Sequence, residues 1–273
     1  MQTMDGVCLS LAGKVALITG GSRGIGAETV RLFCGAGARV VFNYRSARQA
    51  AEALAIECGG AERCVALGQE LAAVEQGRAL VERAASVFGR LDCLVVNHGV
   101  WPPQDAPIDS MAEQQWRSTL GINLDSVFGL VQAAVAQMKR QPRRAREASD
   151  SGLPASGHIV LVSSTAGQRG EAFHADYAAS KGALLSLTKS LSSELAREGI
   201  YTNCVAPGWV ATEMSAAALA DPGSRDRIYA GIPLGRVGTA REIAGPILFL
   251  CTPYAGFMSG EIVNVNGGAV LVG

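Results

Sequence analysis

The sequence lacks the features that would place it in several specialised classes of protein. Its three histidines and seven cysteines are scattered along 273 residues, without a Cys-x-x-C pair or a cysteine/histidine cluster. This scatter argues against a disulfide framework and a structural zinc site, and it favours a reducing cytosol. Basic and acidic residues balance at 24 each, so no net charge attracts nucleic acid or an anionic membrane.

Long apolar runs are also missing. No segment approaches about 18 uninterrupted apolar residues, and residues 1–11 contain no basic residue that would begin a signal peptide. We therefore expect a cytoplasmic protein with no metal, no nucleic-acid partner and no membrane contact. Hydrophobic residues nevertheless make up 48% of the chain, enough for one well-buried α/β domain. We expect this domain over residues 13–273, after a loosely held tail at 1–12.

Strand and helix signals alternate along the chain. Short apolar runs predict strands at 15–19, 39–43, 64–67, 91–96, 158–163, 201–205 and 262–265. Helical spacing predicts helices between them at 25–36, 49–58, 74–88, 113–140, 177–197 and 242–250. Strands without polar alternation, separated by helices, indicate a parallel sheet covered on both faces. The predicted fold is a single-domain, doubly wound α/β sheet of about seven strands.

One segment interrupts this alternation. Residues 141–157 mix proline, glycine, serine and arginine, and they are long for a helix-to-strand connection of about 2 to 6 residues. We interpret them as an inserted surface loop, with a partner-docking loop as the alternative. In a parallel sheet such a loop lies at the amino ends of the strands, so its arginines should not touch a ligand.

A glycine-rich turn follows the first predicted strand and opens the first predicted helix. It reads Thr-Gly-Gly-Ser-Arg-Gly-Ile-Gly over residues 19–26. Glycines there permit a tight turn and a close approach to a pyrophosphate, which the helix amides and dipole stabilise. The spacing Gly20, Gly24, Gly26 differs from G-x-G-x-x-G and has a wider first gap, so the pattern alone is weak evidence.

Tyr177 and Lys181 lie four residues apart on a predicted helix and so share one of its faces. An ammonium beside a phenol lowers the phenol pKa from about 10 toward neutrality, where proton transfer is most effective. Alone, such a pair is usually an ordinary feature of an amphipathic helix. Combined with a nucleotide cradle, it predicts an enzyme that interconverts a carbonyl and an alcohol.

The charges after the second strand indicate the cofactor. An NAD site usually carries an acid about 20 residues past the glycine turn, whereas a 2′-phosphate needs arginine. No acidic residue stands between Glu28 and Glu52, while Arg45 follows the strand and Arg23 lies in the turn. Two arginines without a carboxylate favour NADP(H) over NAD(H), unless both are solvated surface residues.

The motifs occur in an order that resembles one family. In sequence these are T-G-x-x-x-G-x-G, Asn97-His98-Gly99, Asn123, Ser164, Tyr177-x-x-x-Lys181 and Pro207-Gly208-x-x-x-Thr212. Over essentially residues 13–268 they resemble the short-chain dehydrogenase/reductase family, within it the 3-oxoacyl-(acyl-carrier-protein) reductases and related carbonyl reductases. The resemblance implies a Rossmann-type fold and a homotetramer with two-fold symmetry.

The resemblance also implies a role for each catalytic residue. Tyr177 would exchange a proton with the substrate oxygen, to which Ser164 would hydrogen-bond. Lys181 would bind the nicotinamide ribose and lower the tyrosine pKa, and Asn123 would hold a water behind the lysine. The implied cofactor-binding residues are Gly20, Ser22, Arg23, Gly24, Ile25, Gly26, Tyr44, Arg45, Ser46, Glu70, Leu71, Asn97, His98, Gly99, Tyr177, Lys181, Pro207, Gly208, Val210 and Thr212.

His98 departs from the family pattern, which commonly reads Asn-Asn-Ala-Gly at this point. We expect a structural or cofactor-contacting role for its imidazole, with a catalytic histidine as the alternative. Residues 209–235 resemble the mobile lid that covers substrate in the family. Trp101, His174, Trp209 and Met214 are the expected substrate-binding residues.

The expected substrate is a ketone or secondary alcohol, either a 3-oxoacyl thioester or a small carbonyl compound. Two positions where carrier-protein reductases tend to carry arginine are Ser193 and about Ala155 here, which weakens the case for carrier-protein docking. Two other classes stay open. A catalytically silent NADP(H)-binding sensor or scaffold would bind without turnover, and a nucleic-acid binder would use the basic cluster at 139–146.

Overall fold

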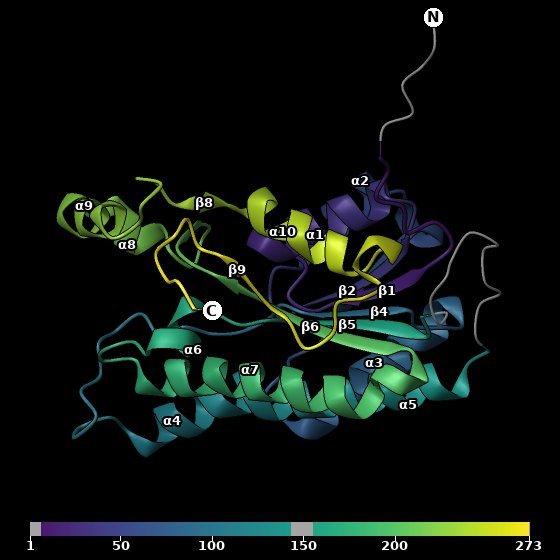
Figure 1. Cartoon of the computed structure of the whole chain (residues 1–273), viewed down its shortest axis with the longest axis horizontal. Helices are drawn as coiled ribbons and strands as arrows, with labels where there is room; N and C mark the ends of the chain where they lie inside the picture. Colours follow the sequence, from purple (N-terminus) through teal and green to yellow (C-terminus); the bar gives the residue numbers. More distant parts are fainter. Residues whose placement is uncertain (1–6, 143–154, 273) are drawn as a thin grey trace, which may run out of the picture.

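The computed structural model describes residues 7–142 and 155–272, in which seven parallel strands form one sheet (Figure 1). The strand order is β3-β2-β1-β4-β5-β6-β9. The strands are β1 (Val15–Ile18), β2 (Arg39–Tyr44), β3 (Cys64–Gly68), β4 (Cys93–Val96), β5 (Gly157–Val162), β6 (Ile200–Pro207) and β9 (Ile262–Val265). The predicted doubly wound α/β fold is confirmed.

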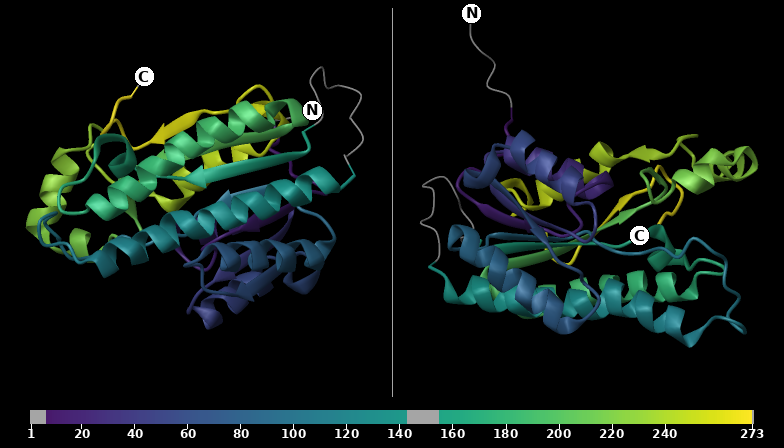
Figure 2. Two further views of the ribbon diagram at one scale, coloured as in Figure 1. Left: turned by 90° about the horizontal axis from the view of Figure 1, so that it is seen from below. Right: turned by 180° about the vertical axis from the view of Figure 1, so that it is seen from behind.

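Helices cover both faces of this sheet (Figures 1 and 2). One face carries α1 (Gly24–Gly35), α2 (Arg48–Glu57) and α10 (Ala240–Leu250); the other carries α3 (Val74–Phe88), α4 (Glu113–Leu120), α5 (Ser126–Arg140) and α7 (Ala175–Leu195). Ala16 and Ile18 of β1 pack into the core beside α1, whereas Leu17 between them packs into the core beside α3 and α5. Because both faces are buried, the strand needs apolar residues at every position.

The order of the strands reverses beside β1. The chain runs outward from β1 to β2 and β3, returns to β4 on the other side of β1, and continues outward to β5, β6 and β9. The connections after β1 and β4 therefore diverge at their carboxyl ends. In open α/β sheets this divergence leaves the crevice where ligands bind.

The helical region predicted at 113–140 is present, but it is not uniform. A π-helical turn, η2 (Gly121–Asp125), joins α4 to α5 and carries Asn123. Such turns occur frequently at functional sites. Within the described ranges this segment alone is long and apolar enough to span a bilayer, yet half of its most apolar window is buried inside the protein. That burial is expected of a helix that covers the core of a sheet.

The remaining elements are short. They are η1 (Gly60–Glu62), α6 (Thr165–Arg169), η3 (Ala196–Glu198), β7 (Val210–Ala211), α8 (Ala216–Ala220), α9 (Pro222–Ala230), β8 (Gly238–Thr239) and η4 (Pro253–Ala255). β7 and β8 pair in parallel at the base of a projection that contains α8 and α9, at the left of Figure 1. Neither of these two helices buries a residue.

Two predictions about irregular segments have different outcomes. The tail predicted at 1–12 is shorter than expected, because Leu11 is fully buried and its N–H donates to the Ala36 carbonyl at 2.8 Å. The burial of Leu11 could not be predicted, because a single apolar residue among small and polar neighbours gives no periodic pattern. The surface loop predicted at 141–157 lies mostly outside the described residues, since 143–154 are not among them.

Candidate active site

A crevice at the carboxyl ends of the strands brings most of the predicted site residues together. Every predicted cofactor-binding residue except Gly26 lines it, as do Ser164, Trp101, Trp209 and Met214. Asn123 and His174 are not among its lining residues. The crevice lies beside β1 and β4, where the sheet topology places a ligand site.

The glycine turn has the backbone geometry that a nucleotide cradle requires. Gly20 and Gly24 have φ angles of +63° and +52°, in the left-handed region that favours glycine. A Cβ on Gly26 would overlap the Gly20 carbonyl, so Gly26 acts behind the crevice by letting the helix approach the strand. The Gly20 N–H donates to Asn43 Oδ1 at 2.8 Å, which fixes the turn against β2.

Positive charge gathers where a nucleotide phosphate would lie. The first turn of α1 has no side-chain cap and no acidic residue of its own, so its amides are free to bind an anion, and the Glu213 carboxylate lies beside Gly24. Arg23 and Arg45 are exposed, line the crevice and form no ion pair within the described residues. Arg48 instead pairs with Glu52 at 2.7 Å. The narrow glycine cradle and two unpaired guanidinium groups fit a dinucleotide with an additional phosphate.

His98 holds the loop after β4 in place. Its Nδ1 lies 2.8 Å from Thr19 Oγ1, and its Nε2 lies 2.8 Å from Ser126 Oγ. Burial, followed by repulsion from Lys181, lowers the pKa of His98 to about 3, so the ring is neutral. Because the Ser126 hydroxyl donates to the Ile122 carbonyl, the His98 proton is on Nε2. A neutral ring engaged at both nitrogens has a structural role, although the residue also lines the crevice.

Ser164, Tyr177 and Lys181 converge from two helices. Ser164 caps α6 by accepting the Ala166 N–H at 3.1 Å, and its side chain interacts with that of Tyr177 and opposes the rise of the tyrosine pKa. Lys181 Nζ donates to the Val162 carbonyl at 2.9 Å and lies 5.9 Å from the centre of the Tyr177 ring. The neighbouring Ser163 hydroxyl donates to the Lys181 carbonyl at 2.7 Å, and so fixes the helix to β5.

Burial controls the protonation of the tyrosine and lysine. Desolvation raises the pKa of Tyr177 to about 12; the Ser164 hydrogen bond opposes this and the Glu171 carboxylate adds to it. Desolvation also lowers the pKa of Lys181 to about 8. In this structure the cost of desolvating the phenolate dominates, and the prediction that Lys181 moves the tyrosine pKa toward neutrality stays a prediction. At neutral pH Tyr177 therefore keeps the proton that it would give to a substrate oxygen.

The two helices of this group touch through glycine. A Cβ on Gly167 of α6 would lie 2.6 Å from the backbone carbon of Lys181, and one on Gly182 of α7 would lie 3.2 Å from the Gly167 carbonyl. The backbones are thus in direct contact. Gly182 therefore packs within its own chain.

Asn123 lies behind the catalytic group. Its Oδ1 accepts the Val100 N–H at 2.8 Å, and its Nδ2 donates to the Val100 carbonyl at 2.9 Å and to Ser180 Oγ at 3.0 Å. A Cβ on Gly99 would be 3.2 Å from both Asn123 Oδ1 and Lys181 Nζ, so the amide lies next to the lysine. Its role in a proton relay stays a prediction.

Aromatic side chains gather at the end of the crevice where we expect the substrate to bind. The rings of Trp101 and Trp209 meet edge to face at 6.2 Å, and Trp101 Nε1 donates to Glu171 Oε1 at 3.2 Å. The His174 ring is buried and stacks on Trp101 at 4.7 Å, with its Nε2 2.9 Å from the Pro102 carbonyl. The prediction that His174 lines the substrate entrance is corrected: it supports Trp101 from behind.

Several lining residues were not predicted. They are Asn43, Ala47, Gln69, Val100, Ile122, Val162, Ser163, Thr165, Ala166, Arg169, Glu171, Glu213 and Ser215. Asn43 could have been found from its place at the end of a strand that faces the glycine turn. No sequence signal marks Glu171, which burial gives a raised pKa and which reaches the crevice through the turn after α6.

The comparisons with known proteins identify the family of the chain. A family profile described as "Enoyl-(Acyl carrier protein) reductase" matches residues 20–270. The chain is 34% identical over 265 residues to a 3-oxoacyl-[acyl-carrier-protein] reductase of Synechocystis sp., covering 96% of this chain and 99% of that protein. It is 33% identical to the Escherichia coli protein of the same name, covering 97% and 100%.

Solved structures show the same fold. One is a short-chain dehydrogenase/reductase, glucose/ribitol dehydrogenase, from Brucella melitensis (TM-score 0.83, 32% identity, covering 96% of this chain and 98% of that one). Another is a putative NAD(P)-dependent gluconate 5-dehydrogenase from Beutenbergia cavernae with bound NADP at low occupancy (TM-score 0.84, 32% identity, covering 96% and 99%). Fold and site define a Rossmann-type oxidoreductase. The chain belongs to the short-chain dehydrogenase/reductase family.

Proposed function

We propose that the protein is an NADP(H)-dependent carbonyl reductase that acts on 3-oxoacyl thioesters or small ketones, with Tyr177 as its acid/base. The observation that carries the proposal is a half-buried phenol beside Ser164 and Lys181, in the crevice that also contains the glycine cradle. A bound nicotinamide supplies the hydride. The chain itself has to bind the substrate, orient its oxygen and provide the proton.

Each residue of the group has a distinct part in that task. Ser164 orients the substrate oxygen, and Tyr177 donates its hydroxyl proton to it as the alcohol forms. Lys181 has its pKa lowered to about 8 by burial, so most of it is ammonium at neutral pH. That charge stabilises the phenolate left behind, and the same group is placed to bind ribose hydroxyls.

The cofactor assignment depends on charge. Arg23 and Arg45 line the crevice and have no carboxylate partner among residues 7–142 and 155–272, as recognition of a 2′-phosphate requires. The bound NADP of the Beutenbergia cavernae protein supports this choice.

The substrate assignment depends on the relatives and on the crevice wall. The curated relatives at 33 to 35% identity are named 3-oxoacyl-[acyl-carrier-protein] reductases. Trp101, Trp209 and Met214 provide an apolar wall suited to an acyl chain. Ser193, where an arginine would help a carrier protein to dock, is exposed and bonded to the Lys189 carbonyl of its own helix. We therefore favour a thioester or free ketone over a substrate that requires a tightly docked carrier.

The test is NADPH oxidation with acetoacetyl thioesters, diketones and cyclic ketones. We expect Tyr177→Phe to lower kcat by at least about 10²-fold with nearly unchanged NADPH affinity, because it removes only the proton donor. Tyr254→Phe is the matched control, since Tyr254 is exposed and lies outside the crevice. NADPH binding without turnover of any ketone would favour the silent sensor or scaffold instead.

We further propose that the protein is a cytoplasmic homotetramer. Exposed apolar residues such as Phe128 on α5 and Leu271 near the end of the chain are suited to contacts between subunits. Light scattering at micromolar concentration tests this, and a mass near that of one 28.3 kDa chain would contradict it.

A further inference from the structure

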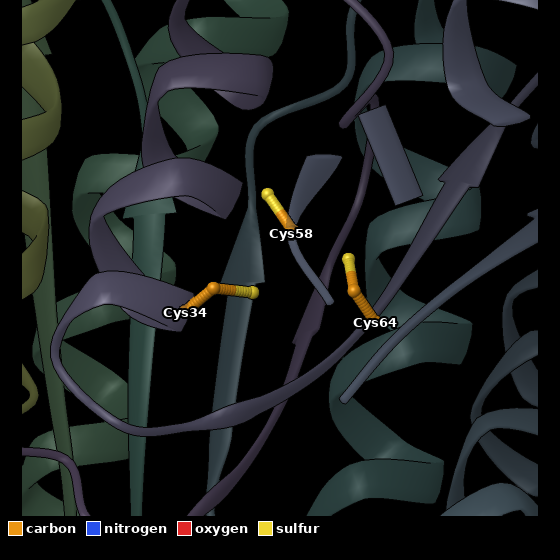
Figure 3. A group of neighbouring side chains, drawn as sticks. All are labelled: Cys34, Cys58 and Cys64. Atoms are coloured by element: carbon orange, nitrogen blue, oxygen red, sulfur yellow. The ribbon is translucent and has the colours of Figure 1, made fainter. Parts of the chain in front are cut away.

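Three cysteines that are distant in the sequence come together on the α1 face of the sheet. Cys34 lies in the last turn of α1, Cys58 directly follows α2, and Cys64 begins β3 (Figure 3). Their sulfur atoms all lie within 4.8 Å of one another, and all three side chains are buried. The scattered spacing along the chain concealed this group, which we call the thiol cluster.

The thiol cluster is separate from the catalytic crevice. Cys64 begins its strand, Cys34 lies in the last turn of α1 and Cys58 directly follows α2, and the amino ends of both helices face the crevice. None of the three lines the crevice. The cluster therefore lies toward the amino ends of the strands, on the side away from the crevice, where a ligand of the cluster would not contact cofactor or substrate.

The sulfur positions are close to those of a three-thiolate metal site. Three sulfurs bound about 2.3 Å from one ion in a plane would be about 4.0 Å apart. Starting from separations of at most 4.8 Å, each sulfur would need to move inward by no more than about 0.5 Å. Side-chain rotation alone can supply a movement of that size.

The surroundings supply one compensating charge. The Arg63 guanidinium donates to the Cys34 carbonyl at 2.8 Å. Three thiolates around a divalent ion carry a net charge of −1, which one guanidinium balances. A monovalent ion would leave a second negative charge without compensation in a buried place.

We propose that Cys34, Cys58 and Cys64 bind one thiophilic divalent d¹⁰ cation of the Zn²⁺ class as three thiolates. Binding forms three metal–sulfur bonds and releases three thiol protons to solvent, with no change in oxidation state. Water completes the coordination of zinc. The ion links α1, α2 and β3, so it stabilises the cofactor-binding half of the fold without taking part in the reaction.

Cadmium is the probe, because its thiolate complexes absorb in the ultraviolet. With the full reduced chain we expect a charge-transfer band that saturates at one Cd²⁺ per chain. The band should be lost in Cys34→Ala, Cys58→Ala and Cys64→Ala, and retained in the controls Cys8→Ala and Cys251→Ala. No saturable band, or a band that persists in the three cluster variants, would overturn the proposal.

A second measurement needs no variant. The X-ray absorption spectrum of the zinc-loaded wild-type chain should show three sulfur neighbours at about 2.3 Å. A shell of only oxygen and nitrogen would refute the site. A second result would also refute the site: a purified chain in which two cysteines of the cluster form a disulfide, with loss of two hydrogens, and which binds no zinc after that disulfide is reduced. NADPH turnover should be the same with and without bound metal, which keeps this test independent of the proposed function.

Discussion

Replacing Arg45 with Asp and Arg23 with Ala should reverse or abolish the preference for NADPH. Both guanidinium groups line the crevice and lack an ion-pair partner within the described residues. Removing both leaves a 2′-phosphate without a cation. The new carboxylate at position 45 would repel that phosphate and could accept a hydrogen bond from a ribose 2′-hydroxyl.

The expected magnitude follows from the exposure of the two side chains. A charge-assisted hydrogen bond contributes about 1.5 to 3 kcal/mol, equivalent to roughly 10- to 150-fold in affinity. Arg23 and Arg45 are exposed, so solvent screening places each near the lower end, at about 10-fold. Independent effects would multiply to about 100-fold against NADPH, with little change for NADH.

The assay compares kcat/KM for NADPH and NADH at low and high salt. Added salt should narrow the wild-type preference, because these charges are exposed to solvent. Arg48→Ala is the matched control, since Arg48 is exposed on the same segment but pairs with Glu52. The reasoning fails if wild type has the higher specificity constant with NADH, or if Arg48→Ala weakens NADPH as much as the double change does.

Three further predictions concern single positions. Gly26→Ala should abolish cofactor binding or folding because its Cβ would overlap the Gly20 carbonyl, whereas Gly35→Ala, with open space around it, should be tolerated; thermal melts and NADPH titrations compare them. Glu171→Gln should shift the pH profile of alcohol oxidation to lower pH, because the carboxylate raises the pKa of Tyr177; an unchanged profile would remove Glu171 from this role. Burial lowers the pKa of His158 to about 3 in the folded chain. As the pH falls below about 6.5, His158 therefore binds a proton in the unfolded chain but not in the folded one, and the free energy of unfolding decreases until the pH approaches 3. His158→Gln should reduce that loss by about 1.4 kcal/mol per pH unit, as measured by urea unfolding between pH 6 and pH 5.

The fold could be predicted closely because its signals are local. The helix at 74–88 and the strand at 262–265 have the predicted ends, and most other boundaries differ by one or two residues. The π-helical turn at 121–125 could not be predicted, since no residue type marks it. The burial of Leu11 was equally hidden, because it depends on a contact with Ala36 far along the chain.

The site was predictable where a motif directly follows a strand. Most residues of the glycine turn, and most of those directly after β4 and β6, line the crevice for this reason. Properties that depend on the surroundings were not predictable. The pKa of Tyr177 depends on how completely the fold removes it from water, and the position of His174 depends on the path of the loop near Pro102.

The glycine contact between α6 and α7 divides the enzyme into two parts that can change independently. Ser164 and Tyr177 belong to helices whose backbones touch at Gly167 and Gly182, so neither can shift without the other. The two helices of the projection over residues 210–239 bury no residue; its ends pair through β7 and β8, and its Leu234 N–H donates to the Gly267 carbonyl at 3.2 Å. An exchange of that projection between relatives should therefore transfer substrate preference while the proton-transfer chemistry is inherited unchanged. Selection for new substrates, or an engineer seeking one, can act on the projection alone.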